Sequence, residues 1–383
     1  MAKKNLLILV ANTGIGGQER VAINTAGILK EDYNTMLAIF NRQEHNYDFD
    51  GTLINLELPP VQGEFEKIMN VFRRVRALKK LKREYKIDVT MSFGTSANLV
   101  NALAKTSDKK IVSVRGYGSL TKSPWGKMIS RLVYGRADVV ITVAKKLSED
   151  LAALYDIPAA KVKTVYNPYD LTELSDLAGH PVPIEIGSPT IVSVGRMQKV
   201  KGYRHLINAM AHVIAFIPQA KLLLIGTGDE AAALQKYTEK LGLIDNVLFA
   251  GFQPNPYSYE AKCDLYALSS INEGFPNTLV EALACGLPIV AADCRTGPRE
   301  ILMEHYENRT AEGIEYADYG VLVPPFVSDE SHEPEKDKLF AEAIIEMLTN
   351  RKRCSRYKEK LAERAGTFSF KAYREKMIEI IEA

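Results

Sequence analysis

Short apolar segments rich in β-branched residues recur along this chain, and segments with a helical spacing of apolar residues separate them. This alternation is typical of parallel sheets, in which a helix connects each strand to the next and both faces of the sheet are covered. The alternation therefore predicts an α/β fold. The runs that we expect as strands are 6–11, 35–40, 89–93, 110–115, 138–143 and 162–168 in the first half, and 190–196, 221–226, 246–251, 264–270, 288–293 and 320–324 in the second half.

The runs fall into two similar groups, and the irregular segment 176–189 separates them. That segment has three prolines and two glycines, a composition typical of a linker. The chain has 383 residues, enough for two domains at roughly 100 to 200 residues each. We therefore expect two doubly wound Rossmann-like domains that face each other across a cleft, over 1–175 and 188–367. The C-terminal segment 368–383 has one apolar side and is predicted to form a helix that crosses back to the first domain.

Charge and composition exclude several classes of protein. The formal net charge is only +2, so we expect no nucleic acid or other long polyanion as a partner. No stretch reaches the roughly 18 apolar residues of a membrane span. The N-terminal apolar run ends after seven residues in a glycine-rich turn, which favours a first core strand over a signal peptide. The four cysteines lack paired metal-ligand spacing and are expected to be reduced thiols of a cytosolic protein.

The turn after the first predicted strand is rich in glycine. Ligands of open parallel sheets bind at the turns that follow strands. Gly16 and Gly17 would allow the backbone there to approach a phosphate or a sugar, although a plain tight turn explains them as well. The spacing is not the G-x-G-x-x-G of dinucleotide-binding enzymes, which disfavours a nicotinamide-dependent enzyme.

The turn after 190–196 is basic, with Arg196, Lys199 and Lys201 just before a predicted helix. Cations at a helix N-terminus oppose the helix dipole, which favours anions at that end. An anionic ligand such as a diphosphate would remove the conflict, because Arg and Lys both bind phosphate oxygens. A solvated basic loop is the alternative.

Two glutamates lie close together in the segment SSINEGFPNTLVEALACGLPIVAAD, residues 269–293. Glu273 follows a predicted strand, so its side chain is expected at the cleft. Glu281 comes after a Gly-Pro turn, early in a short helix whose apolar residues lie on the other side. We interpret both carboxylates as ligands of a hydroxyl-rich molecule, while an ordinary surface carboxylate remains the alternative for Glu281.

The segment EGFPNTLVEALACGLPIVAADCRTGPREIL, 273–302, together with VGRMQKVKGY, 194–203, resembles the retaining glycosyltransferases of family 4, which have the GT-B fold. Members of this family have two glutamates spaced as here, an Arg and a Lys after the first strand of the second domain, and a Gly-Gly loop after the first strand of the chain. The resemblance extends over essentially the whole chain, with these elements in the same order. It implies a glycosyltransferase that uses a nucleotide sugar.

The resemblance also implies residue roles. Glu281 would hold the ribose hydroxyls of the nucleotide, and Glu273 would bind hydroxyls of the donor sugar. Arg196 and Lys201 would neutralise the diphosphate as the glycosidic bond breaks. The remaining donor contacts would come from Gly16 and Gly17, from Gly274, Phe275, Pro276 and Asn277, and from backbone groups near 251–257, which would face the base.

Three further expectations concern the chemistry. We expect no metal and no cofactor, because cationic side chains can take the place of a metal on the diphosphate. Retention in this family is described as attack on the same face of the sugar, with the leaving diphosphate accepting the proton, so we assign no protein base. Many relatives have a His after 110–115, where this chain has Arg115. Arg cannot act as a base at neutral pH, and we predict that Arg115 binds the donor or an anionic acceptor.

The segment 64–89 has the highest charge in the chain, with nine basic residues and one acidic residue between 67 and 86. As a helix, it would place Ile68, Val71, Phe72, Val75 and Leu78 on an apolar inner side. Arg73, Arg76, Lys80 and Arg83 would follow another side over roughly 15 Å. We interpret these cations as a contact for an anionic membrane surface or for a lipid diphosphate, with a solvated helix face as the alternative.

The prediction is a retaining, metal-independent glycosyltransferase that moves a hexose or an N-acetylhexosamine from a nucleotide sugar, expected to be a UDP-sugar. The acceptor is expected to be a lipid-linked oligosaccharide or a polysaccharide, because the chain looks similar to bacterial transferases that extend polyprenyl-diphosphate-linked glycans. The expected location is the cytoplasmic face of the cell membrane, as a peripheral protein. A sugar-nucleotide epimerase of similar shape and a catalytically inactive nucleotide-sugar-binding subunit are the alternatives.

Overall fold

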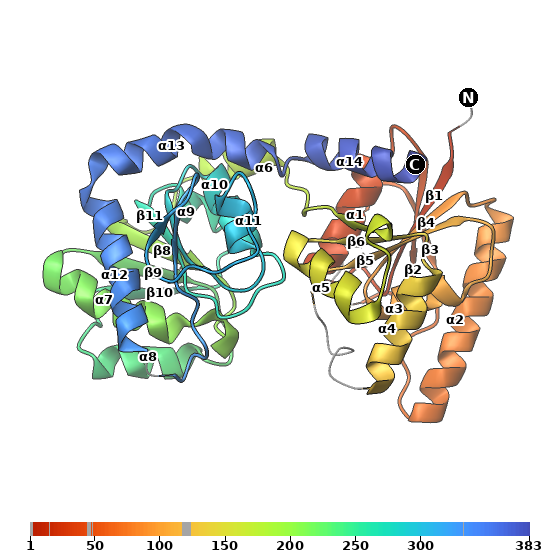
Figure 1. Ribbon diagram of the computed structural model, residues 1–383, viewed down its shortest axis with the longest axis horizontal. Coiled ribbons are helices and arrows are strands. Elements are labelled where there is room, and N and C mark those ends of the chain that lie inside the picture. The colour runs from red at the N-terminus through yellow and green to blue at the C-terminus, as the bar shows by residue number, and fades with distance from the viewer. Residues whose placement is uncertain (1–2, 15, 44–46, 48, 117–123, 332) are drawn as a thin grey trace. The chain divides into compact units, whose positions relative to one another are not determined.

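The computed structural model describes residues 3–14, 16–43, 47, 49–116, 124–331 and 333–383 (Figure 1). The chain forms two compact units. The first unit contains the described residues up to Pro168 and the C-terminal segment Phe370–Ala383, and the second unit contains Tyr169–Ser369. Each unit is an open sheet with helices, so the predicted α/β class is confirmed.

The first unit has a parallel sheet of seven strands in the order β3-β2-β1-β4-β5-β6-β7. The chain moves outward from β1 in one direction to β3 and then continues from β4 in the other, so the direction reverses between β1 and β4. This is the doubly wound arrangement. The strands are β1 (Asn5–Val10), β2 (Asn34–Ile39), β3 (Thr52–Asn55), β4 (Val89–Phe93), β5 (Lys109–Val114), β6 (Val139–Thr142) and β7 (Val162–Thr164).

The central strand β1 is buried on both faces, which explains its continuous apolar sequence. Leu6 and Ile8 belong to a core cluster with residues of α1 and the C-terminal α14, whereas Leu7 and Leu9 belong to a cluster with residues of α2 and α3. The helices of this unit are α1 (Gly17–Ile28), α2 (Glu64–Glu84), α3 (Thr95–Leu103), α4 (Pro124–Arg136), α5 (Lys145–Tyr155) and α14 (Phe370–Glu382), with a 3-10 turn at Ala159–Lys161.

The second unit repeats the design, with the strand order β10-β9-β8-β11-β12-β14-β13. Its chain direction reverses between β8 and β11, which are hydrogen-bonded neighbours. The edge strand β13 is antiparallel to β14, and the other pairs are parallel. The strands are β8 (Thr190–Val194), β9 (Lys221–Ile225), β10 (Val247–Gly251), β11 (Leu265–Leu268), β12 (Ile289–Ala292), β13 (Glu315–Tyr316) and β14 (Val321–Val323).

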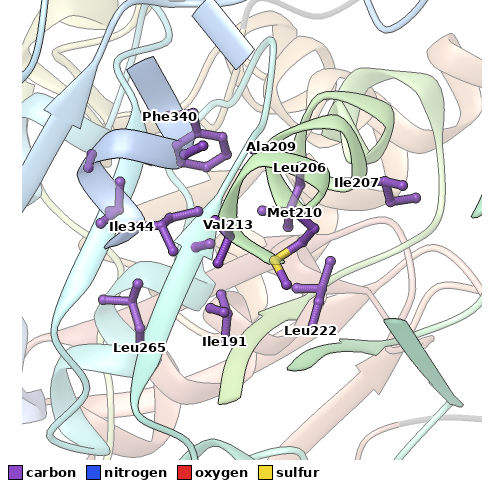
Figure 2. Packing of buried hydrophobic residues seen from close by; sticks show 14 of the residues in the cluster. Ile191, Leu206, Ile207, Ala209, Met210, Val213, Leu222, Leu265, Phe340 and Ile344 are labelled. Carbon is purple, nitrogen blue, oxygen red and sulfur yellow. The ribbon is translucent and has the colours of Figure 1, made fainter. Parts of the chain in front are cut away.

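Helix α7 forms much of the core of this unit. Figure 2 shows Leu206, Met210 and Val213 of α7 in one cluster with Ile191 and Leu222 of the sheet. Residues of α12 complete the cluster. The helices of this unit are α6 (Leu171–Ala178), α7 (Tyr203–Phe216), α8 (Ala231–Lys240), α9 (Tyr257–Glu260), α10 (Asn277–Ala284), α11 (Pro298–Leu302), α12 (Pro334–Thr349) and α13 (Arg351–Gly366), with a 3-10 turn at Lys199–Lys201.

Each of the twelve runs predicted as strands contains a strand, and the sequence prediction missed two. The missed strands, β3 and β13, are short edge strands with partly exposed side chains, so they lack a continuous apolar run. The predicted first domain, 1–175, includes most of α6, whereas in the structure α6 lies in the second unit and packs against α9 and α10. Helix α14 packs in the first unit through Tyr373, Met377, Ile380 and Ile381.

Candidate functional site

The basic loop after β8 is held firmly against the end of β11. The Ser269 hydroxyl donates to the Lys201 carbonyl at 2.9 Å, and the Ile271 amide donates to the Val200 carbonyl at 2.9 Å. Gly202 has a φ of +61°, and a Cβ there would lie 2.3 Å from the Ser269 carbonyl oxygen. Only glycine fits this position, because both the backbone angle and the close approach exclude a side chain. The start of α7 is therefore fixed relative to β11.

Lys201 and Glu273 meet where the loops after β8 and β11 come together. The Lys201 ammonium lies 2.7 Å from Glu273 Oε1, and both side chains are largely buried, with exposures of 21% and 11%. The Ser270 hydroxyl donates to the same carboxylate oxygen at 2.7 Å, and the Thr296 hydroxyl donates to the Glu273 carbonyl. The direction of the sheet reverses between β8 and β11, and ligands of open α/β sheets bind at such a point.

Arg196, five residues before Lys201 in the same loop, is exposed. Its side chain makes no ion pair and no hydrogen bond within the part of the chain that the structure describes. The next residue, Met197, is buried, and its backbone pairs with Thr227 and Glu230 of the loop after β9. The backbone at Arg196 is thus anchored while its guanidinium stays available to an anion.

Helix α10 begins directly after Glu273, with Pro276 as its N-cap residue. Gly297 lies against this start, since a Cβ there would lie 2.1 Å from Cδ of Pro276. Asn277 accepts a hydrogen bond from the Tyr169 hydroxyl at 2.6 Å, and Phe275 is buried near Phe368. Gly274 is half-buried. The predicted donor-contact segment 274–277 is therefore the N-terminus of a helix, where the dipole favours anionic groups.

Glu281 is buried, with 8% exposure, so the alternative of an ordinary surface carboxylate is wrong. The Tyr257 hydroxyl donates to Glu281 Oε1 at 3.4 Å. Tyr257 ends the segment 251–257, which the sequence prediction assigns to the base of the nucleotide. Glu260, also on α9, is fully buried, and burial together with the nearby Glu281 raises its pKa well above the usual range. The raised pKa reflects the cost of ionising two adjacent buried carboxylates together.

In the first unit, the direction of the sheet reverses between β1 and β4. The glycine-rich turn follows β1, and Arg115 follows β5, the next strand beyond β4. Gly16 is the N-cap residue of α1, and Gly17 is its first residue. The Arg115 guanidinium donates to Ser113 Oγ at 2.9 Å and to Asn167 Oδ1. Arg115 also lines a cavity of about 220 Å³, and Gln18, Thr95, Asn98 and Tyr134 are among the other lining residues. The cavity is the size of a small polar group or a sugar ring, below the usual range for ligand pockets.

Helix α2 does not bury the side that the sequence pattern predicts. Ile68 and Phe72, which we expected inside, are exposed by 56% and 63%, and Leu78 alone of the predicted inner residues is fully buried. The inner side instead contains cations. Arg74 donates to the Leu58 carbonyl at 2.7 and 3.1 Å, and Lys82 contacts Asp108 at 2.8 Å. The apolar pattern predicts the wrong side because Arg74 and Lys82 can be buried: each has a hydrogen-bond acceptor or an opposite charge as its partner.

The outer face of α2 therefore combines apolar and basic residues. Four apolar side chains, Phe65, Ile68, Met69 and Phe72, lie exposed on its first half. The predicted cations Arg73, Arg76, Lys80 and Arg83 are all exposed, and Arg76, Lys80 and Arg83 continue the same face toward the C-terminal end at spacings of three and four. Figure 1 shows α2 at the outside of this unit. We call these residues the α2 face, defined as Phe65, Ile68, Met69, Phe72, Arg76, Lys80 and Arg83.

The described residues provide neither a group of side chains placed to hold a metal ion nor a helix that could span a membrane. Within the described residues, no group of three His, Cys, Asp or Glu side chains is placed to hold a metal ion. The sequence contains one D-x-D spacing, Asp48 to Asp50; Asp48 lies outside the described residues, and Asp50 pairs with Lys30 at the surface. All four cysteines are free thiols. None of the described helices is long and apolar enough to cross a membrane.

Sequence inspection missed three residues that hold the predicted site residues. Ser270 and Thr296 fix Glu273, and Tyr257 contacts Glu281. Ser270 is three residues from Glu273 on the same loop, so its position after a predicted strand was an available signal. Thr296 comes from the loop after β12 and Tyr257 from helix α9, and only the folded chain brings them to the glutamates.

Comparison with known proteins shows the family of this chain. The model of the family "Glycosyl transferases group 1" matches residues 181–364, and that of "Glycosyltransferase Family 4" matches residues 15–173. An uncharacterized glycosyltransferase of Methanocaldococcus jannaschii is 30% identical over 327 residues, which cover 78% of this chain and 80% of the relative.

Two further relatives extend the comparison. A Campylobacter jejuni protein is 29% identical over 379 residues, covering 95% of this chain and 96% of its own. It is named N-acetylgalactosamine-N,N'-diacetylbacillosaminyl-diphospho-undecaprenol 4-alpha-N-acetylgalactosaminyltransferase. The crystal structure of Anabaena HepE in complex with UDP superimposes with a TM-score of 0.75 at 19% identity, over 99% of both chains. The chain therefore belongs to the glycosyltransferases of group 1 and family 4, and it has the GT-B fold.

Proposed function

We propose that this glycosyltransferase is retaining and metal-independent, and that it moves a hexose or N-acetylhexosamine from a UDP-sugar to a lipid-linked oligosaccharide or polysaccharide. The observation that carries the proposal is the Lys201–Glu273 pair at the reversal point of the second sheet. The pair consists of a cation and a carboxylate, and Glu273 lies four residues before the first residue of α10.

The proposed chemistry assigns a separate task to each group. As the glycosidic bond breaks, negative charge builds on the leaving diphosphate, and Arg196 and Lys201 stabilise that charge. The preformed contacts of Lys201 reduce the reorganisation that this stabilisation needs. Glu273 accepts hydrogen bonds from donor-sugar hydroxyls, and Glu281 accepts them from the ribose. The acceptor hydroxyl attacks the same face of the sugar and gives its proton to the diphosphate.

The choice of donor is supported by the names of similar proteins. Anabaena HepE has been crystallised with UDP and with UDP-glucose, and the Campylobacter jejuni relative is named as an N-acetylgalactosaminyltransferase. The buried Glu281 supports a ribose contact, because a carboxylate held away from water binds hydroxyl pairs more strongly than an exposed one.

The choice of a membrane-linked acceptor is supported by the α2 face. Exposed aromatic and aliphatic side chains on one half of a helix, followed by cations on the same face, are typical of helices that lie on anionic membranes. Each cation near such a surface contributes about 1 kcal/mol. The Campylobacter jejuni relative is named for an undecaprenol-linked substrate. We propose peripheral binding to the cytoplasmic face of the cell membrane through the α2 face.

A panel of UDP-, GDP- and ADP-sugars, measured with and without EDTA, tests the donor and the metal independence. We expect one UDP-sugar to raise the melting temperature and to be hydrolysed slowly, to the same extent in EDTA. Loss of hydrolysis in EDTA would contradict metal independence. Binding without turnover for any acceptor would favour the inactive binding subunit, and conversion to an epimeric UDP-sugar without acceptor would favour the epimerase.

A matched set of variants tests the membrane proposal. Phe65→Ser with Phe72→Ser, and separately Arg76→Ser with Lys80→Ser and Arg83→Ser, should each lower binding to phosphatidylglycerol vesicles about tenfold or more. Donor hydrolysis should not change. Phe216 and Phe252 of the second unit are also exposed, by 67% and 72%, so Phe216→Ser with Phe252→Ser is the control. Equal vesicle binding by wild type, the two α2-face variants and the control variant would rule out the α2 face as the membrane contact.

A further inference from the structure

A second basic cavity lies in the second unit, away from the site described above. Its volume is about 330 Å³, and it lies between α13 and the turn that joins β13 to β14. That turn precedes the amino end of β14, whereas Lys201 and Glu273 lie beyond the carboxyl ends of β8 and β11. Figure 1 shows α13 on the outside of this unit. The lining residues that matter here are Tyr316, Asp318, Lys352, Arg353, Arg356 and Lys360.

The charge of this cavity is strongly positive, with four cations against the single carboxylate of Asp318. Lys352, Arg356 and Lys360 follow one another at a spacing of four, which places them on one face of α13. All three are exposed, and none forms an ion pair within the described part of the chain. Like charges at this spacing destabilise a helix, so an anion bound between them would relieve their repulsion.

The walls of the cavity are held in place before any ligand binds. The Arg353 guanidinium stacks on the Tyr316 ring at 3.8 Å, and its Nε donates to Glu346 Oε1 at 3.1 Å. The buried Tyr357 donates from its hydroxyl to the Ala317 carbonyl at 3.0 Å, which ties the turn to α13. Asp318 already accepts a hydrogen bond from the Glu304 amide at 2.9 Å. A ligand therefore meets a fixed Arg and three exposed cations that can adjust around it.

We propose that this cavity binds a phosphate or diphosphate group. The group has several acceptor oxygens, and Arg and Lys donate charge-assisted hydrogen bonds to them. Residues four apart rise about 6 Å along a helix, so two such cations can each reach one phosphate of a diphosphate. The phosphate can come from a soluble compound or from the headgroup of an anionic lipid, and the two sources share this chemistry.

The test is pyrophosphate binding by calorimetry, with full-length protein that also contains Arg196→Ala and Lys201→Ala so that the proposed donor site contributes little. In that background, Lys352→Gln with Arg356→Gln and Lys360→Gln should weaken binding about tenfold or more. The control removes the same charge from the same unit through the exposed Lys236, Lys240 and Lys262, each changed to Gln. The control should bind like its parent.

Sedimentation with phosphatidylglycerol vesicles distinguishes the two sources. Weaker pyrophosphate binding with unchanged vesicle binding by the cavity variant assigns the cavity to soluble phosphates, and weaker vesicle binding, with or without weaker pyrophosphate binding, assigns it to lipid headgroups. If the cavity variant matches the control in both assays, the proposal is overturned. All six substituted side chains are at the surface, so we expect circular dichroism to show unchanged folding. The pyrophosphate and vesicle assays test this cavity alone. The assignment of the donor is tested separately, by the panel of UDP-, GDP- and ADP-sugars.

Discussion

Replacing Lys201 by alanine is expected to lower the rate of sugar transfer by about a hundredfold or more, and Glu273→Ala is expected to do the same. The reason is that Lys201 would stabilise the charge that develops on the diphosphate only in the transition state, and Glu273 both holds Lys201 at 2.7 Å and would bind the donor sugar. Initial rates at saturating donor, and donor KM, are the quantities to measure.

The matched control is the neighbouring Lys199. Its ammonium pairs with Glu330, and both side chains are more than half exposed. Exposed pairs contribute little, so Lys199→Ala should stay within about twofold of wild type. A rate for Lys201→Ala and Glu273→Ala close to that of Lys199→Ala would remove this pair from the catalytic site. A large rise in donor KM at unchanged kcat would instead limit the pair to donor binding.

Replacing His205 by alanine is expected to cost about 3–5 kcal/mol in the free energy of unfolding, because it removes the cationic partner of the buried Asp337 carboxylate, which within the described residues keeps only the hydrogen bond from Asn208. His205 is fully buried in the first turn of α7, four residues after Lys201. Its Nδ1 lies 2.7 Å from Asp337 Oδ1, its Nε2 lies 2.8 Å from the Ser328 carbonyl, and its ring stacks on Phe326. His212, exposed on the same helix, is the control, and His212→Ala should have little effect.

The stability that His205 contributes should depend on pH. Burial by itself lowers the pKa of His205, but the hydrogen bonds to Asp337 and to the Ser328 carbonyl and the charges of Asp337 and Glu333 outweigh it, so the pKa is raised. Both ring nitrogens face acceptors, and only the protonated ring donates to both. This stabilisation is therefore complete below the ordinary pKa of about 6.5 and is lost as pH rises through the raised value of the folded protein.

Urea unfolding of wild type and His205→Ala at about pH 6 and about pH 8.5 checks the sign. The difference between the two proteins should be larger at the lower pH. A difference that grows with pH would mean that the ring is neutral in the folded state. Transfer rates measured on the same variant would show whether the segment that His205 anchors also supports the Lys201 loop.

Much of the site was predictable because local residue patterns encode it. The positions of Arg196, Lys201 and Glu273 after predicted strands follow from the rule that such turns meet at one edge of a parallel sheet, and the structure brings Lys201 and Glu273 into contact. The roles of these residues remain predictions. The hydrogen bond from Ser270 to Glu273 was within reach of sequence reasoning, since both residues follow the same predicted strand. The hydrogen bond from Thr296 was not predictable, because Thr296 follows β12 and approaches Glu273 only in the folded chain.

The sequence by itself determined the α/β class, the two doubly wound units and the loops that could bind a ligand, because these follow from local periodicity and from glycine and charge positions. The tertiary structure decided which side of a helix is buried. Helix α2 places Arg74 and Lys82 inside and Phe65 and Phe72 outside, against its apolar pattern, and Glu281 is buried although its own sequence position favoured a surface carboxylate. The physical reason is that burying a charge is acceptable only when distant segments supply partners, such as Asp108 for Lys82, and those partners are known only once the chain has folded.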